Sequence, residues 1–226
     1  MSAHSQPNRP EKSQLKSLQI RKARILNKVR NSTITSNGPS TNLYKRMTFP
    51  EFERFREQEG NREKQVEFID NFVYMAPSPT IKHQRISREL LTGIHLSLKN
   101  TDCEVFDAPT DLVLTIEDTQ NVVIPDLFVV CNLDEEETKR VTKTPLLVIE
   151  IMSNNRVDDE VTKFVKYEQA GIPEYWIVDP EERVITQYIL NAENKYPAKG
   201  HSFKAGTITS VFVPSYTANV SELLNL

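Results

Sequence analysis

Residues 146–152, with the sequence LLVIEIM, form an apolar run that contains a single acid, Glu150. A continuous apolar run of this length is typical of a strand that is covered on both faces of a sheet. The spacing over residues 158–170 predicts a helix directly after it, with Gly171 as its C-terminal stop. Residues 174–190 then predict a β-hairpin. This order of elements predicts an α/β fold with a mixed central sheet flanked by helices.

Upstream of that core, the sequence predicts further helices and strands. Thr48 and Glu51 have the spacing of a capping box at the start of a helix that Gly60 ends. Residues 66–75 predict two short strands around a turn, and residues 82–99 predict a helix. Further strands are predicted at residues 104–106, 111–115 and 122–130 and near residues 210–213, with a short final helix near residues 220–224.

The charge of the 226-residue chain is divided unevenly along its length. Residues 1–46 hold ten Lys or Arg and one acid, a net charge of +9, whereas the rest holds 18 basic and 30 acidic residues, a net charge of −12. We therefore predict a basic N-terminal extension, flexible or helical, over residues 1–46 and one folded domain over residues 47–226. Three interpretations of the extension stay open: a phosphate-binding arm, a helix that docks on a partner, and a solvated tail.

Composition and cysteine content exclude several classes of protein. No apolar run approaches the ~20 residues that a membrane-spanning helix needs, and the N-terminus has no apolar signal segment. Two cysteines, Cys103 and Cys131, are too few for a disulfide scaffold or a four-cysteine zinc site. Both lie among apolar neighbours, which favours buried free thiols. We therefore expect a protein of the reducing cytoplasm, without contact to a membrane.

Two acids lie in strands that are otherwise apolar. Glu150 interrupts the run at residues 146–152, and Asp126 follows Pro125, which removes a donor from the ladder and favours an edge, a bulge or a bend. A carboxylate in such a place is costly unless it is paired, protonated or bound to a metal. If the two strands are neighbours, the carboxylates converge, and a hard cation such as Mg²⁺ relieves their repulsion. The alternative is that each carboxylate caps a turn or pairs with a core Lys or Arg.

A lysine in the following helix supplies a third polar group. Lys163 lies about five residues into the helix, roughly 8 Å along its axis, from where its side chain can reach the end of the strand that carries Glu150. Lys166, one turn further on, is a rival for this position. The alternative is an exposed lysine that pairs with Asp159, four residues before Lys163.

The order of these residues resembles the Uma family of proposed restriction endonucleases, which falls within the PD-(D/E)XK nuclease superfamily. The similarity covers about residues 47–190. The segments that carry it most specifically are Pro125-Asp126, Glu150-Ile-Met152, KFVKY at residues 163–167 and GIPEYWIVDP at residues 171–180. TFPEF at residues 48–52, VEFID at residues 66–70, MAPSP at residues 75–79 and HQRI at residues 83–86 resemble further segments of the family.

The resemblance implies a restriction-endonuclease-like core with a metal site. Asp126 and Glu150 would hold Mg²⁺, for which Mn²⁺ can substitute, and Glu67 would be a further ligand or would orient one. Met152 stands where an E-x-K motif would place its lysine. Because the family commonly carries this lysine in the following helix, Lys163 would take its role.

These residue types suit the hydrolysis of a phosphodiester bond. A metal activates water and clamps the phosphate, and a lysine steadies the water or the phosphoryl group. We therefore expect a Mg²⁺-dependent endonuclease that acts on DNA, with His83 and Lys166 as candidates for contact with the substrate. A homodimer would allow both strands to be cut. The alternative is a catalytically inactive nuclease-fold module that binds nucleic acid or a protein partner.

Overall fold

The computed structural model describes residues 45–75, 78–133, 139–152 and 157–226. All of them belong to one unit, Thr41–Leu226. The predicted basic extension lies outside these residues except for its last two positions, and the predicted boundary at residue 47 stays a prediction. None of the helices in the described part of the chain is long and apolar enough to cross a membrane.

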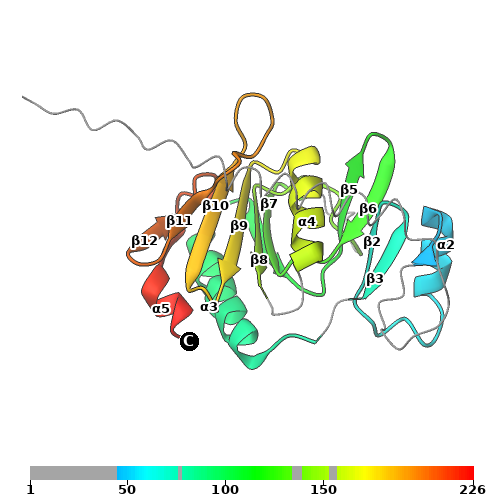
Figure 1. Cartoon of the computed structure of the whole chain (residues 1–226), viewed down its shortest axis with the longest axis horizontal. Coiled ribbons are helices and arrows are strands. Elements are labelled where there is room, and N and C mark those ends of the chain that lie inside the picture. The colour runs from blue at the N-terminus through cyan, green and yellow to red at the C-terminus, as the bar shows by residue number, and fades with distance from the viewer. Residues whose placement is uncertain (1–44, 76–77, 134–138, 153–156) are drawn as a thin grey trace, which may run out of the picture. The chain divides into compact units, whose positions relative to one another are not determined.

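A six-stranded mixed sheet is the largest sheet of this unit (Figure 1). In spatial order its strands are β11 (His201–Phe203), β10 (Val184–Ile189), β9 (Glu174–Asp179), β8 (Leu147–Ile151), β7 (Leu127–Cys131) and β4 (Cys103–Asp107). β8 and β9 are parallel and are connected by α4 (Val157–Gln169), whereas the other neighbouring pairs are antiparallel. A parallel pair requires such a crossover because a hairpin turn reverses the chain. The predicted α/β fold with a mixed sheet is confirmed.

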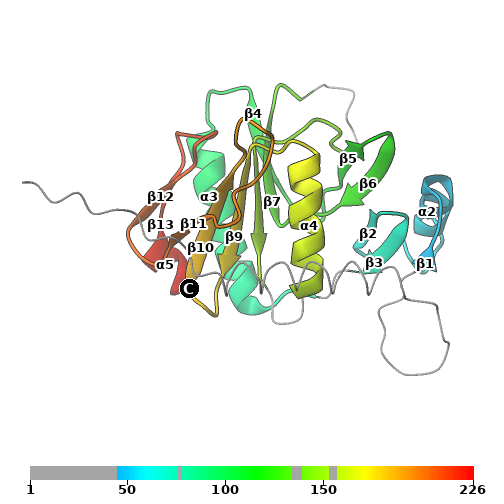
Figure 2. The ribbon, with the colours of Figure 1, turned by 45° about the horizontal axis from the view of Figure 1, so that its top comes forward.

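Two helices cover the opposite faces of this sheet (Figures 1 and 2). α3 (Ile81–Ser97) shares a core cluster with Ile149 of β8, and α4 shares another cluster with Val148 of the same strand. Side chains alternate along a strand, so Glu150 lies on the same face as Val148, the face that α4 covers. The apolar character of residues 146–152 follows from this burial on both sides.

A five-stranded antiparallel sheet packs against α4 from the other side. In order, its strands are β1 (Lys45–Arg46), β3 (Phe72–Met75), β2 (Val66–Ile69), β6 (Thr119–Val123) and β5 (Leu112–Ile116). Leu112 and Leu114 of β5 lie in one core cluster with Tyr167 of α4. α2 (Phe49–Arg56) covers this sheet through Phe52, whose ring stacks on Phe68 with 4.7 Å between centroids. The predicted capping box at the start of α2 is confirmed.

The prediction of one strand over residues 122–130 is wrong, because this segment forms two strands in two different sheets. β6 ends at Val123 and β7 begins at Leu127. Between them, Pro125 has no N–H, and Ile124 donates its N–H to the side chain of Glu67 at 2.7 Å rather than to a neighbouring strand. The short link at residues 124–126 therefore carries the chain from one sheet to the other.

The C-terminal part also differs from its prediction. β12 (Thr207–Thr209) and β13 (Thr217–Asn219) pair as a two-stranded sheet, and α5 (Val220–Leu224) follows. The final helix is confirmed, but the strand predicted near residues 210–213 is wrong. That segment is held instead by buried Glu174 of β9, whose Oε2 accepts hydrogen bonds from Ser210 Oγ at 2.6 Å and from the N–H groups of Val211 and Phe212, both at 2.9 Å.

The prediction of two free thiols is wrong, because Cys103 and Cys131 form a disulfide. The two residues lie directly opposite each other in the antiparallel pair of β4 and β7. The bond ties β4, which is an edge strand of the six-stranded sheet, to its neighbour. Reducing compartments disfavour structural disulfides, and the expected cytoplasmic location stays a prediction.

Candidate active site

Asp126, directly before β7, lies opposite Glu150 of the neighbouring strand β8. Leu127 of β7 pairs with Ile149 of β8 in the antiparallel register, so the neighbouring residues Asp126 and Glu150 form the next opposed position. Oδ2 of Asp126 accepts the N–H of Ile151 at 2.7 Å, which fixes this carboxylate against β8. Both acids are buried. Two carboxylates that are 24 residues apart in sequence are thus brought to the same end of two neighbouring strands.

Lys163 of α4 reaches Glu150 and Glu67. Its Nζ lies 3.1 Å from Oε1 of Glu150 and 2.9 Å from Oε1 of Glu67. Lys166 points elsewhere, because its Nζ donates to Oδ1 of Asp70 at 2.6 Å, in the turn between β2 and β3. Of the two rival lysines, Lys163 is the one that contacts the acids.

Glu67 joins the five-stranded sheet to the site. It lies on β2, and its Oε1 both accepts the N–H of Ile124 at 2.7 Å and contacts Lys163. Ile124 belongs to the same short link as Asp126, so this link positions two of the acids. Glu67 and Glu150, which come from different sheets, share one ammonium group.

His83 contacts Asp126 from the first turn of α3. Thr80 caps this helix, and its Oγ1 accepts the N–H of His83 at 3.2 Å. Nε2 of His83 lies 3.1 Å from Oδ2 of Asp126, and it donates there because a carboxylate only accepts. Nδ1 is buried and has no hydrogen-bond partner among the residues that the structure describes. His83 therefore helps to fix the orientation of the Asp126 carboxylate.

Tyr167 is a member of the site that sequence reasoning missed. Its hydroxyl donates to Oε1 of Glu150 at 2.6 Å. Burial, followed by the charge of Glu150, raises the pKa of Tyr167 well above its ordinary value, so the hydroxyl keeps its proton. Tyr167 lies four residues after Lys163 on α4, and residues at this spacing share a helix face. A tyrosine one turn after the candidate lysine is the signal that could have identified it.

Burial and charge act on the two opposed acids with opposite net results. Burial raises the pKa of Glu150 to about 8; Lys163 offsets this in part, and the charge of Asp126 reinforces it. Burial also acts to raise the pKa of Asp126, but the hydrogen bond and charge of His83, a backbone N–H and Lys163 outweigh it and hold this pKa below its usual value. The surroundings of Glu150 thus favour its protonated form, whereas those of Asp126 favour its ionised form.

The free energy of unfolding of the metal-free protein is expected to fall as the pH rises from about 5 to about 8. In this window folded Glu150, with its pKa raised from 4.5 to about 8, keeps a proton that the unfolded chain has released. Each rise in pH therefore favours the unfolded state. Urea denaturation in EDTA at a series of pH values measures this, and Glu150→Gln, which cannot titrate, should give a flatter profile. Parallel profiles for the two proteins would contradict the prediction.

The two opposed carboxylates can bind a divalent cation. The hydrogen bonds and ion pairs given above use only Oδ2 of Asp126 and Oε1 of Glu150. Among the described residues, none of these contacts uses Oδ1 of Asp126 or Oε2 of Glu150. In the same part of the chain, no group of three or more His, Cys, Asp or Glu side chains is arranged around one metal position. Mg²⁺ is commonly bound through one or two carboxylates and completes its octahedron with water and phosphate oxygens, so this donor set fits it.

Comparison with known proteins identifies the family. The sequence model of the Uma2 family, described as "Putative restriction endonuclease", matches residues 49–221. The chain belongs to this family. The match spans all of the candidate site residues, and the resemblance drawn from the sequence is confirmed. Membership in Uma2 supports a nuclease function in general terms.

Two relatives of this Uma2 protein show how far the similarity extends. It is 28% identical over 141 residues to "Uncharacterized protein slr1290" of Synechocystis sp., an alignment that covers 62% of this chain and 73% of that protein. It also resembles the crystal structure of "a putative nuclease belonging to DUF820" from Anabaena variabilis, with a TM-score of 0.63 and 21% identity, over 79% of this chain and 98% of the other. The second likeness shows a shared fold.

Proposed function

We propose that this Uma2 protein is a metal-dependent endonuclease that hydrolyses phosphodiester bonds in DNA. The observation that carries the proposal is the opposed pair Asp126 and Glu150, with Nζ of Lys163 3.1 Å from Glu150. Hydrolysis of a phosphodiester needs an activated water and positive charge at the phosphoryl oxygens. Two acids that fit a cation, with a lysine beside them, supply both, and membership in Uma2 supports the same class of reaction.

We assign the binding of Mg²⁺, for which Mn²⁺ can substitute, to Asp126 and Glu150. Glu67 is assigned as a further ligand or as the residue that orients one, because it shares Lys163 with Glu150. When bound, the cation supplies a water of lowered pKa and a positive charge for the phosphate. Because burial raises the pKa of Glu150, we expect binding of the cation to favour loss of its proton.

The other residues of the site act on charge and orientation. Asp126 is held by the N–H groups of Ile151 and His83, so its carboxylate keeps one direction. Lys163 presents ammonium donors that orient the attacking water or stabilise the charge on the phosphoryl group. His83, which contacts Asp126 from the first turn of α3, stays a candidate for contact with the substrate. Lys166, which pairs with Asp70, receives no role in the reaction.

Purified protein is expected to cut plasmid DNA in the presence of Mg²⁺ or Mn²⁺, and EDTA should prevent cleavage. Single-stranded DNA in the same assay gives the strand preference. Asp126→Ala, purified in the same way, controls for a contaminating nuclease and should be inactive, because it removes one of the two proposed ligands. The proposal fails if wild type does not cut, or if Asp126→Ala cuts as well as wild type does.

The second candidate is a nuclease-fold module that binds nucleic acid or a protein partner without cutting. Met152 at the E-x-K lysine position favours it, as does the net charge of −12 over residues 47–226. Titration calorimetry with Mg²⁺ separates the two candidates. If wild type binds the cation and Glu150→Gln does not, the result supports the enzyme; if wild type does not bind it, the result supports the module. If the enzyme cuts both strands, we propose that it acts as a homodimer. We also propose that the extension at residues 1–46 contacts phosphates of the nucleic acid.

A further inference from the structure

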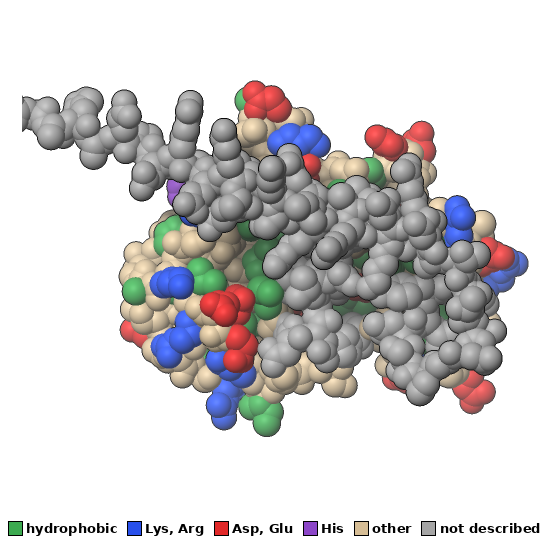
Figure 3. All heavy atoms as spheres, in the orientation of Figure 1, with side chains coloured by type: hydrophobic (Ala, Val, Ile, Leu, Met, Phe, Trp, Pro, Cys, Tyr) green, Lys and Arg blue, Asp and Glu red, His purple; other side chains and the backbone are tan. Residues whose placement is uncertain are grey.

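A nucleic acid that binds to the folded domain needs a local positive charge there. Residues 47–226 carry a net charge of −12, which repels a polyanion at long range. On the part of the surface that Figure 3 colours by residue type, acidic and basic side chains are interspersed and form no continuous basic face. A phosphate that binds to this face needs a local group of cations.

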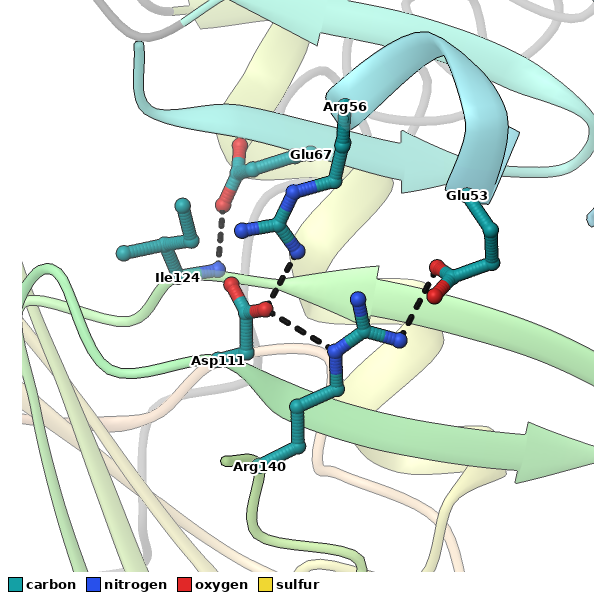
Figure 4. Close-up of polar contacts among 6 residues, drawn as sticks. All are labelled: Glu53, Arg56, Glu67, Asp111, Ile124 and Arg140. Atoms are coloured by element: carbon teal, nitrogen blue, oxygen red, sulfur yellow. Dashed lines mark hydrogen bonds and ion pairs between the residues drawn. The ribbon is translucent and has the colours of Figure 1, made fainter. Parts of the chain in front are cut away.

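Arg56 and Arg140 converge on one carboxylate (Figure 4). Arg56 is the last residue of α2, and its Nη1 donates to Oδ2 of Asp111. Nε of Arg140 donates to the same oxygen at 3.1 Å. Two guanidinium groups that contact one carboxylate carry one positive charge more than Asp111 neutralises.

Strands β5 and β6 connect this arginine pair to the candidate active site. The register of β5 and β6 pairs Leu112 with Val123, so Asp111, one residue earlier, lies opposite Ile124. The N–H of Ile124 holds the Glu67 carboxylate at 2.7 Å. Figure 4 draws both groups of contacts, with Glu53 and Arg56 on α2 and Glu67 on a strand of the five-stranded sheet.

The excess charge is balanced by Glu53, and this acid is held weakly. Oε1 of Glu53 lies 2.9 Å from Nη1 of Arg140, but its side chain is 36% exposed, whereas that of Asp111 is 7% exposed. Water competes for an exposed ion pair, which therefore contributes little to stability. A phosphate makes a stronger pair, because two of its oxygens match the fork of a guanidinium group. Glu53 thus lies where a phosphate of the substrate fits.

Both arginines are held in place before a ligand arrives. Cζ of Arg56 lies 5.6 Å from the ring centroid of Phe52, within the range of a cation–π contact. Arg140 precedes Val141, whose N–H donates to the carbonyl of Asp111 at 3.0 Å. The two arginine side chains are 25% and 24% exposed, so part of each guanidinium faces solvent. Side chains that are already ordered lose little entropy on binding.

We propose that Arg56 and Arg140 form a subsite for a backbone phosphate of the nucleic acid, and that this phosphate displaces Glu53 from Arg140. The subsite lies on the side of the five-stranded sheet that α2 covers, and it binds a phosphate of the same nucleic acid away from the cleaved bond. This inference rests on the proposed function in one respect, namely that the ligand is a nucleic acid. DNA and RNA both carry this phosphate.

The full chain and a fluorescently labelled duplex DNA, mixed in EDTA at several salt concentrations, test the subsite without cleavage. Arg140→Gln is expected to weaken binding about tenfold, the loss of one hydrogen bond between charged groups. The slope of log K against log salt should also become shallower by about one, because one phosphate contact is lost. Glu53→Gln is expected to tighten binding, because it removes the acid that competes with the phosphate.

Arg54→Gln and Glu57→Gln are the matched controls, because both are exposed residues at the same helix and change the net charge equally. Each control should alter the affinity by less than about twofold, since exposed charges are screened by salt. If the ion pair is only a structural support, Arg140→Gln and Glu53→Gln will lower thermal stability together and will not move binding in opposite directions. That outcome overturns the subsite.

Two further arms complete the test. Arg140→Lys keeps the charge and should keep the salt slope, which provides a folded variant if Arg140→Gln unfolds. RNA of the same sequence should show the same changes, and a response of DNA alone would overturn the assignment to a phosphate. If Arg140→Gln weakens DNA binding and Glu53→Gln tightens it, but the wild-type protein does not cut DNA, the endonuclease proposal fails and the subsite stands. If the wild-type protein cuts DNA but neither variant changes the affinity for DNA, the subsite alone fails.

Discussion

Replacement of Lys163 by methionine is expected to slow DNA cleavage by on the order of a thousandfold, the effect of removing a preorganised donor from a transition state. Lys163 brings a buried ammonium group to within 3.1 Å of Glu150, and methionine keeps an unbranched chain without the charge. Single-turnover rates at saturating Mg²⁺ measure the change. Calorimetry should still detect Mg²⁺ binding, because no carboxylate is removed.

Lys166→Met is the matched control for this experiment. Lys166 lies on the same helix and is also buried, at 8% exposure against 3% for Lys163, but it pairs with Asp70. Its cleavage rate should stay within a few-fold of wild type. Equal losses in both variants would mean that the integrity of α4 sets the rate. Cleavage by Lys163→Met at the wild-type rate would remove the lysine from the proposed mechanism.

Replacement of Glu174 by alanine is expected to lower the free energy of unfolding by at least about 4 kcal/mol, a large part of the stability of a typical domain. Glu174 is fully buried and accepts five hydrogen bonds. Trp176 Nε1 and Gln187 Nε2 donate to Oε1 at 2.6 and 2.7 Å, and the segment at residues 210–212 donates to Oε2. A donor that loses its acceptor in the interior costs about 1–3 kcal/mol.

Urea denaturation measures this loss, with Glu182→Ala as the control. Glu182 is an exposed acid of the turn after β9, and its replacement should change the free energy of unfolding by less than about 0.5 kcal/mol. Limited proteolysis of Glu174→Ala should cut the segment at residues 210–212, because Glu174 holds that segment to β9. A loss below about 1 kcal/mol would contradict the prediction, because single hydrogen bonds already contribute that much.

Elements with a local signal could be predicted from the sequence, and the pairing of strands could not. The capping box at Thr48, the helix that ends before Gly171 and the hairpin after it depend on neighbouring residues. Residues 122–130 were predicted to form one strand, because Pro125 indicates only an edge, a bulge or a bend. A change from one sheet to another depends on partner strands far along the chain. The disulfide of Cys103 and Cys131 was missed for the same reason, since the two are 28 residues apart and meet only through strand register.

The candidate site shows the same division. The acids could be recognised because a carboxylate in an apolar run is costly unless something compensates it. Lys163 and Lys166 could not be separated, because three residues turn a side chain by only about 60° around a helix. The cluster of Arg56, Asp111 and Arg140 gave no periodic signal, because its members come from three separate segments of the chain.

The link at residues 124–126 limits how the length of this chain can change. The N–H of Ile124 holds Glu67, and two residues later Asp126 enters the site opposite Glu150. Side chains alternate along a strand, so one inserted residue would either turn β7 over or move Asp126 out of its position. Insertions are therefore expected to be tolerated in the hairpin between β5 and β6 or in other loops, and not in this link.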